Sequence, residues 1–102
     1  MLEESRFDWR VPLLFYEALH LLDAVLAHRH RLHPDSHDER FEMLRSSRTG
    51  IPYLVQQAYR GLHEASIIAR YECPSPSYLA QRYARWSDDR DELRKYAETA
   101  LR

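Results

Sequence analysis

Two short runs of polar side chains in this sequence have the residue types and spacing of a site that handles protons or anions. Tyr16, His20 and Asp23 follow one another at intervals of four and three residues, which places them on one side of a helix. A carboxylate one turn from a histidine fixes the tautomer of its ring. We expect these side chains to form one wall of a polar pocket or of a dimer interface. The alternative is that His20 only fills the boundary between two helices.

His37 and Arg40 form the second run, one turn apart at the start of a predicted helix. The N-terminus of a helix offers free N–H groups and the positive end of the dipole, both of which suit a phosphate. His37 can donate to such an anion, and Arg40 can bind it through a forked pair of hydrogen bonds. We predict an anion site here. The alternative is that Arg40 is an exposed residue paired with Asp35 or Glu39, with His37 solvated.

Arg70 and Tyr71 end a later predicted helix next to an irregular Pro-containing segment, and they are further candidates for ligand contact. Three histidines before His37 suggest metal binding, but Pro34 places a loop between His33 and His37. We therefore predict a polar helix end, with no metal and no cofactor. Cys73 is the only cysteine, which excludes an internal disulfide and indicates a reducing compartment.

A long helix over about residues 8–29 or 8–31 must position the first run. Phe15, Leu19, Leu22 and Leu26 recur at helical spacing and are predicted to face the core. Leu13, Tyr16, His20 and Ala27 form a second face, on which we predict homodimerisation.

The later elements are helical as well. Pro34 ends the first helix, and Ser36-x-x-Glu39 is a capping box that starts the second, which ends near residue 46. A third helix is predicted to begin after Gly50, with Pro52 in its first turn, and to end before Pro74, and a last one is predicted from Ser77 onward. The last helix is expected to be continuous, with a break at Ser87 as the close alternative. The third helix is predicted to bury Leu54, Val55, Ala58, Leu62, Ala65, Ile68 and Ala69.

Composition limits the fold class further. A chain of 102 residues predicts one domain over residues 1–102, and two glycines and five prolines leave little material for hairpins. We predict an all-α, antiparallel up-down four-helix bundle, with a short fifth helix if the last one breaks. The net charge of −1 excludes a global field for nucleic acid. Glu17, His20 and Asp23 interrupt the apolar tract 11–26, so we expect a cytoplasmic protein without a membrane span.

Three segments together resemble the HEPN family (higher eukaryotes and prokaryotes nucleotide-binding). They are Phe15-Tyr-x-Ala-Leu-His-x-x-Asp-Ala-x-Leu-Ala27, Ser36-His-x-x-Arg40 and Tyr59-Arg-x-Leu-x-x-x-Ser-x-x-Ala-Arg-Tyr71. The resemblance implies a helical bundle that dimerises, in a toxin–antitoxin or defence context. It also implies RNA or nucleotide binding, or a protein partner of the nucleotidyltransferase type.

One departure from the family bears on activity. The ribonuclease members carry an Arg followed a turn or two later by a His on a late helix, whereas the only formal match here is Arg31-x5-His37, which straddles Pro34. We therefore expect a non-catalytic binding module. The alternative is a metal-independent endoribonuclease with a rearranged site, in which His20 or His37 moves protons and Arg40 or Arg70 steadies the phosphate.

Overall fold

The computed structural model describes residues 7–72 and 75–102, and these residues form four helices without a strand. The helices are α2 (Phe7–His30), α3 (His37–Arg45), α4 (Tyr53–Tyr71) and α5 (Pro76–Ala100). This confirms the prediction of an all-α four-helix bundle. Cys73 and Pro74, on which two of our expectations rest, lie outside the described residues.

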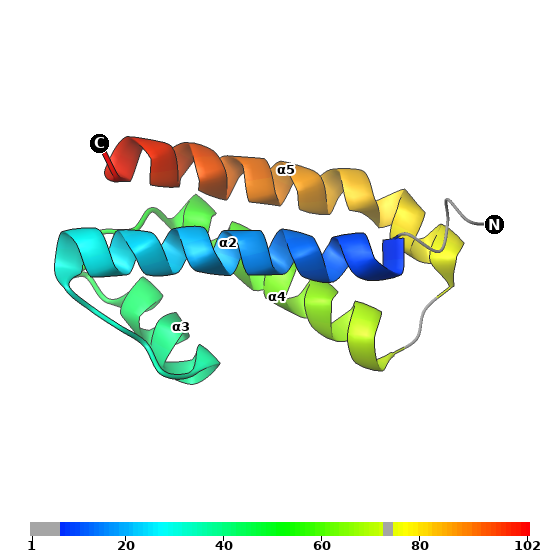
Figure 1. Ribbon diagram of the computed structural model, residues 1–102, viewed down its shortest axis with the longest axis horizontal. Coiled ribbons are helices and arrows are strands. Elements are labelled where there is room, and N and C mark those ends of the chain that lie inside the picture. The colour runs from blue at the N-terminus through cyan, green and yellow to red at the C-terminus, as the bar shows by residue number, and fades with distance from the viewer. Residues whose placement is uncertain (1–6, 73–74) are drawn as a thin grey trace.

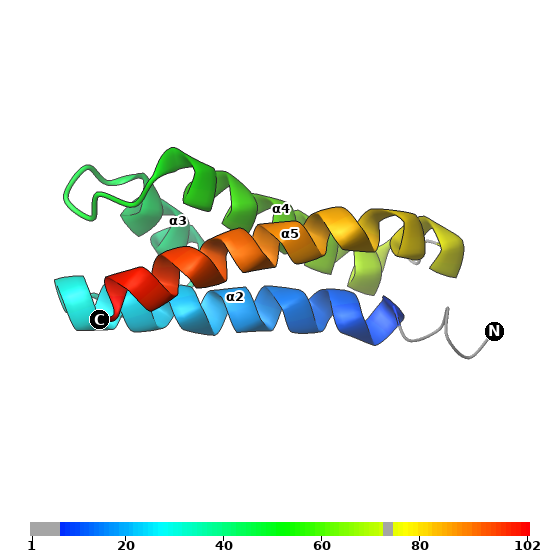
Figure 2. The ribbon, with the colours of Figure 1, turned by 90° about the horizontal axis from the view of Figure 1, so that it is seen from above.

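The three long helices pack against one another, and the short α3 lies against α2 and α4 (Figures 1 and 2). In Figure 1, α4 runs opposite to both α2 and α5, while α2 and α5 run in the same direction. Ring contacts connect α3 to both α2 and α4, through His37 on Phe15 and Phe41 on Tyr59. The second helix of the bundle is therefore a short segment that covers the junction of α2 and α4.

The core is built from the predicted stripe of α2 and from the facing stripes of α4 and α5. Phe15, Leu22 and Leu26 are fully buried as predicted, whereas Leu19 is only half-buried at the edge. Apolar surface removed from water in this way is the main source of stability in a domain of this size. The other large side chains that are fully buried are Val11, Val25, Leu44, Tyr59, Leu62, Leu79 and Leu93.

Leu54 is an exception to the predicted core. It was expected on the buried face of the third helix, but its side chain is 68 % exposed. Val55, next to it, is buried together with Ala58 and Leu62. Successive residues of a helix are rotated by about 100° about the helix axis. When Val55 faces the core, Leu54 therefore lies on the side of α4 that faces α5.

The helix starts follow the capping rules with two differences. The Ser36 hydroxyl accepts from the Glu39 N–H at 3.1 Å, as predicted, but the Glu39 carboxylate accepts from the Asp35 N–H at 2.7 Å instead of closing the box on Ser36. The last helix begins at Pro76, with Ser75 rather than Ser77 as its cap. It continues through Ser87, so the alternative of a break there is wrong.

One described helix segment, Trp9–His30 in α2, is long and apolar enough to cross a membrane by length and composition alone. Those properties are equally typical of the core helix of a bundle, and one face of α2 is in fact packed against α4 and α5.

Candidate functional site

Arg40 lies at the centre of the polar cluster that α2, α3 and α4 form together. Its Nε donates to Asp23 Oδ1 at 2.7 Å and its Nη2 to Asp23 Oδ2 at 3.0 Å. The arginine is only 7 % exposed. It is therefore buried, whereas we had expected it to be exposed. Its partner comes from α2 and is neither Asp35 nor Glu39. Burial disfavours the charged guanidinium, but Asp23 and the nearby Tyr59 together outweigh this effect and raise the pKa of Arg40.

The third nitrogen of the Arg40 guanidinium, Nη1, determines which ring nitrogen of a neutral His37 carries the proton. Arg40 Nη1 lies 3.2 Å from His37 Nδ1. Since an arginine only donates, Nδ1 must be the accepting nitrogen of the ring. The proton of a neutral His37 therefore sits on Nε2, which remains free to donate to a ligand.

His37 meets a second histidine, His63, that comes from α4. The centroids of the two rings are 4.9 Å apart, and Phe15 and Phe41 each contact the His63 ring at centroid distances of 5.3 and 5.2 Å. Burial, and then the neighbouring His37, lower the pKa of His63, against a smaller opposing effect of Glu64. The cluster thus holds one imidazole in its neutral form beside another that is open to solvent.

This environment of His63 makes the free energy of unfolding depend on pH. Because its folded-state pKa is below the ordinary 6.5, His63 takes up a proton at higher pH in the unfolded chain than in the folded one. Its contribution to stability is complete above about pH 6.5 and is lost as the pH falls through that value toward the folded-state pKa. Denaturant titrations at several pH values should show this loss in the parent and a flatter profile in His63→Phe. The exposed His28→Asn variant should retain the parental slope. An unchanged slope in His63→Phe would contradict this assignment.

Tyr59 lies beneath the cluster with its side chain fully buried. Its hydroxyl has no hydrogen-bond partner among the described residues, although the Arg40 guanidinium is near enough to act on it electrostatically. Burial raises the pKa of Tyr59 more than Arg40 lowers it, so the phenol stays protonated at neutral pH. Tyr59 therefore closes the inner side of the site and carries no charge.

Arg70 and Tyr16 form a second pair beside the histidines. The Arg70 guanidinium carbon lies 5.0 Å from the centroid of the Tyr16 ring, at the distance of a cation–π contact. Tyr16 also contacts Phe15, which touches both histidines. Among the described residues Arg70 forms no ion pair with a carboxylate. Its charge is therefore available to an external anion.

The structure thus joins most of the predicted site residues in two neighbouring groups. Asp23, Arg40 and His37 form the first, and Arg70 with Tyr16 forms the second. His20 and Tyr71 are exposed, and within the described ranges neither forms a hydrogen bond or ring contact with them. Arg31, in the left-handed region at φ 55°, is exposed and likewise has no contact with His37 in the part of the chain that the structure describes.

Sequence reasoning missed His63 and Tyr59 as members of this cluster. They are one turn apart on α4, but no local spacing relates that helix to α3. The described residues contain no group of three His, Cys, Asp or Glu side chains placed to hold a metal ion. The chemistry available is therefore hydrogen bonding to an anion and proton exchange at two imidazoles. Comparisons with protein-family models, with curated proteins and with solved structures found no match.

Proposed function

We propose that this chain is a HEPN-like helical module that binds phosphate groups of RNA or a nucleotide, without cleaving them, at the His37–His63 pair. The observation that carries this proposal is the contact of two imidazoles from different helices, with no carboxylate bonded to either among the described residues. The Nε2–H of His37 can donate a hydrogen bond to an oxyanion, and the guanidinium of Arg70 can provide a charge-assisted one.

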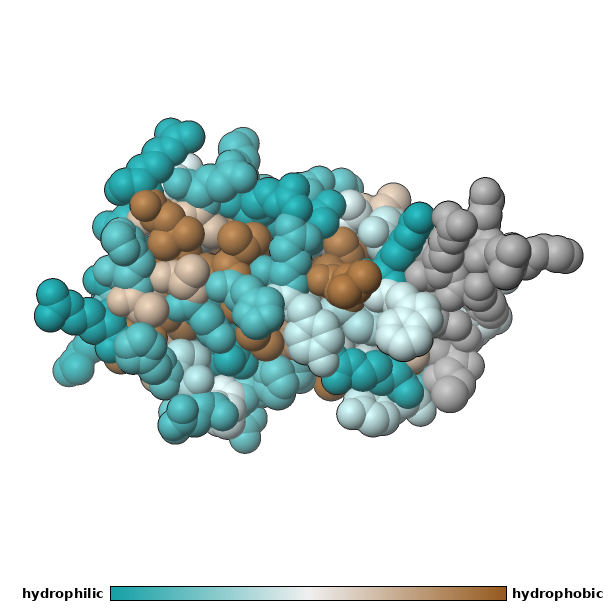
Figure 3. Space-filling view, in the orientation of Figure 1, coloured by the Kyte–Doolittle hydropathy of each residue, from teal (hydrophilic) through white to brown (hydrophobic). Residues whose placement is uncertain are grey.

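The surface next to this pair supports an RNA ligand. Tyr16, which contacts Phe15, exposes an aromatic ring on which Arg70 stacks, and Trp9 and Tyr71 are further exposed aromatic residues of α2 and α4. Hydrophobic and intermediate side chains gather along α2 in the middle of the face that Figure 3 shows. Exposed aromatic rings beside cations are the usual platform for unpaired bases. Because the net charge of the chain is −1, the attraction is local and should weaken as salt is added.

The wider context follows from the family resemblance. As a HEPN-like protein the chain would act in the cytoplasm, as a homodimer, within a toxin–antitoxin or defence system. A nucleotidyltransferase-type protein is the partner that the resemblance implies. A non-catalytic role is supported by the state of Arg40, because each of its three nitrogens already donates to Asp23 or His37 and the guanidinium is held in place by these bonds.

A binding titration on matched variants tests the anion site. Titrating a labelled single-stranded RNA or ATP into the parent should give saturable binding, and His37→Asn or Arg70→Gln should weaken it about tenfold or more, since hydrogen bonds to charged groups contribute roughly 1.5–3 kcal/mol. The control is His28→Asn, because His28 is exposed at the far end of α2. Equal affinity of parent and His37→Asn would remove the site.

The His37–His63 contact also favours one alternative, a metal-independent endoribonuclease. A neutral imidazole can take the proton of a ribose 2′-hydroxyl while a protonated one gives a proton to the leaving oxygen. Incubation of RNA in the presence of a chelator distinguishes the two functions. Binding without cleavage supports the module that we propose, whereas cleavage that His63→Asn abolishes would establish the enzyme.

A further inference from the structure

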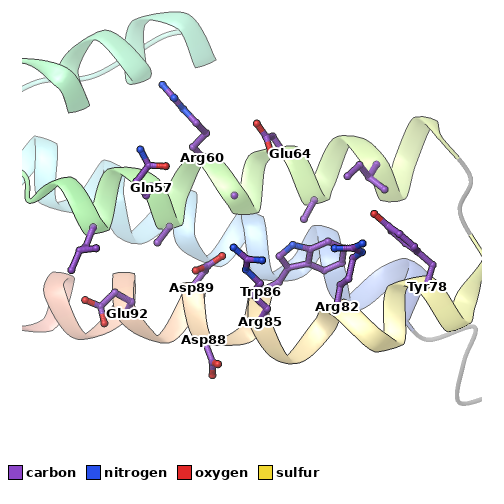
Figure 4. Close-up of a pocket in the computed structure, with 15 residues that line it drawn as sticks. Gln57, Arg60, Glu64, Tyr78, Arg82, Arg85, Trp86, Asp88, Asp89 and Glu92 are labelled. Carbon is purple, nitrogen blue, oxygen red and sulfur yellow. The ribbon is translucent and has the colours of Figure 1, made fainter.

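Three long helices packed together leave three grooves along their length, and two of them are closed in this protein. The groove between α2 and α4 is covered by α3, which Arg40 fastens to Asp23. Along α2 and α5, the Glu17 carboxylate accepts hydrogen bonds from both Arg90 and Arg94. The groove between α4 and α5 is an open hollow of about 710 Å³, and no described segment covers it (Figure 4).

The charged side chains that line this open groove form no ion pairs within the described part of the chain, although Arg82 stacks on the Tyr78 ring. They are Arg60, Glu64, Arg82, Arg85, Asp88, Asp89 and Glu92. Among the described residues none of them forms an ion pair, whereas the charges between α2 and α5 are paired. A groove with unpaired charges of both signs is suited to a surface of opposite charge order.

Asp89 lies deepest among these charged groups. A Cβ at Gly61 would stand 3.1 Å from Asp89 Oδ2, so the absence of a side chain there lets the carboxylate lie against the backbone of α4. Figure 4 shows Asp89 directed toward α4 and Asp88 directed away from it. Asp89 is half-buried and forms no ion pair with a described residue, although Arg85, one turn away on α5, acts on it electrostatically. A further cation that arrives from outside would therefore stabilise it.

On α5, charged residues at equal distances before and after Ser87 have opposite signs. Arg85 and Asp89 lie two residues before and after it, and Arg82 and Glu92 lie five residues before and after it. Their spacing of three, four and three residues keeps all four on one side of the helix. Two antiparallel copies of α5 that cross at Ser87 therefore place each arginine opposite an acid.

Opposite charges at equal distances from a central residue also occur on α4, which forms the other rim of the groove. Arg60 and Glu64 lie two residues before and after Leu62 on α4, with opposite charges. Between the rims, apolar surface is available for burial: Leu54 is largely exposed and Ile68 is half-exposed, while Trp86 is a buried part of the lining. An interface with a twofold axis requires this kind of self-complementary surface.

We propose that the α4–α5 groove is the site at which a second copy of this chain docks, with α5 antiparallel to α5 of the partner. Arg85 and Arg82 of one copy then face Asp89 and Glu92 of the other. This places the dimer interface on α4 and α5 rather than on the α2 face predicted from Leu13 and Tyr16. It leaves the aromatic surface of α2 open, and it does not depend on the anion site.

Charge reversal with exchange of partners tests the proposal. The acidic variant is Arg82→Glu/Arg85→Glu and the basic variant is Asp89→Lys/Glu92→Lys. In sedimentation at low salt the parent should have twice the 12.3 kDa mass of one chain. Each variant alone should dissociate at least about a hundredfold more readily, because like charges placed opposite each other cost several kcal/mol. An equimolar mixture of the two variants should restore the dimer.

Two further variants exclude misfolding and a different interface as explanations of the result. If Asp89→Lys disturbs the contact with Gly61 and lowers the melting temperature, Asp89→Asn/Glu92→Lys replaces it in the mixing experiment. Leu13→Glu, on the exposed face of α2, is the matched control and should remain dimeric. A monomeric parent, variants as dimeric as the parent, a mixture that stays monomeric, or a dimer lost only in Leu13→Glu would each overturn the proposal.

Discussion

Replacing Leu22 by alanine is expected to lower the free energy of unfolding by about 2–5 kcal/mol. Leu22 is fully buried in the middle of α2, where it belongs to the core shared with α4 and α5. The loss combines the transfer energy of the removed carbons with the cost of the cavity that remains. A domain of this length has a total stability of only about 5–15 kcal/mol, so the change is a large fraction of it.

Leu13→Ala, on the exposed face of α2, is the matched control for this measurement. The same chemical change is made there, but the side chain is mostly exposed, and such surface substitutions usually stay within about 0.5 kcal/mol. Denaturant unfolding of the two variants should separate them clearly. Similar losses in both would mean that the helix faces are assigned wrongly.

Arg40→Met is expected to destabilise the protein by roughly 2–3 kcal/mol. The substitution removes both hydrogen bonds to Asp23 and leaves that carboxylate partly buried without its cation. Breaking a fully buried pair costs about 3–5 kcal/mol, but the Asp23 side chain is 32 % exposed, and solvent recovers part of that amount.

The double variant Asp23→Leu/Arg40→Met identifies the cause. If the cost of Arg40→Met comes from the unpaired carboxylate, removing that carboxylate as well should restore much of the stability. A double variant less stable than Arg40→Met would show that packing of the arginine stem, and not its charge, holds α3 in place.

The helices and most of their boundaries could be predicted because the signals are local. The stripe of Phe15, Leu22 and Leu26, the cap at Ser36 and the breaks at Pro34 and Gly50 all act within a few residues of themselves. The start of the last helix was predicted at Ser77 and lies one residue earlier, at Pro76. Pro at the first helical position is a known signal, and it identifies Ser75 as the cap.

The site was only partly predictable because its contacts join distant residues. Arg40 pairs with a carboxylate seventeen residues earlier, and His37 meets His63 on another helix. Sequence pattern identified Asp23, His37 and Arg40 as polar residues worth attention, but it could not show that α3 folds back across α2 and α4. Local spacing favoured Asp35 and Glu39 as partners of Arg40, and tertiary packing chose Asp23 instead.

The claim that His37 and His63 form an anion site is tested most directly by their own ring signals. NMR spectra of the six histidines, recorded while a short RNA is added at low salt and without metal, would follow each ring separately. The signals of His37 and His63 should move together and saturate at one RNA concentration, while those of His28 and His33 should stay in place. Signals of His37 and His63 that do not move, or six signals that all shift weakly without saturation, would contradict this claim.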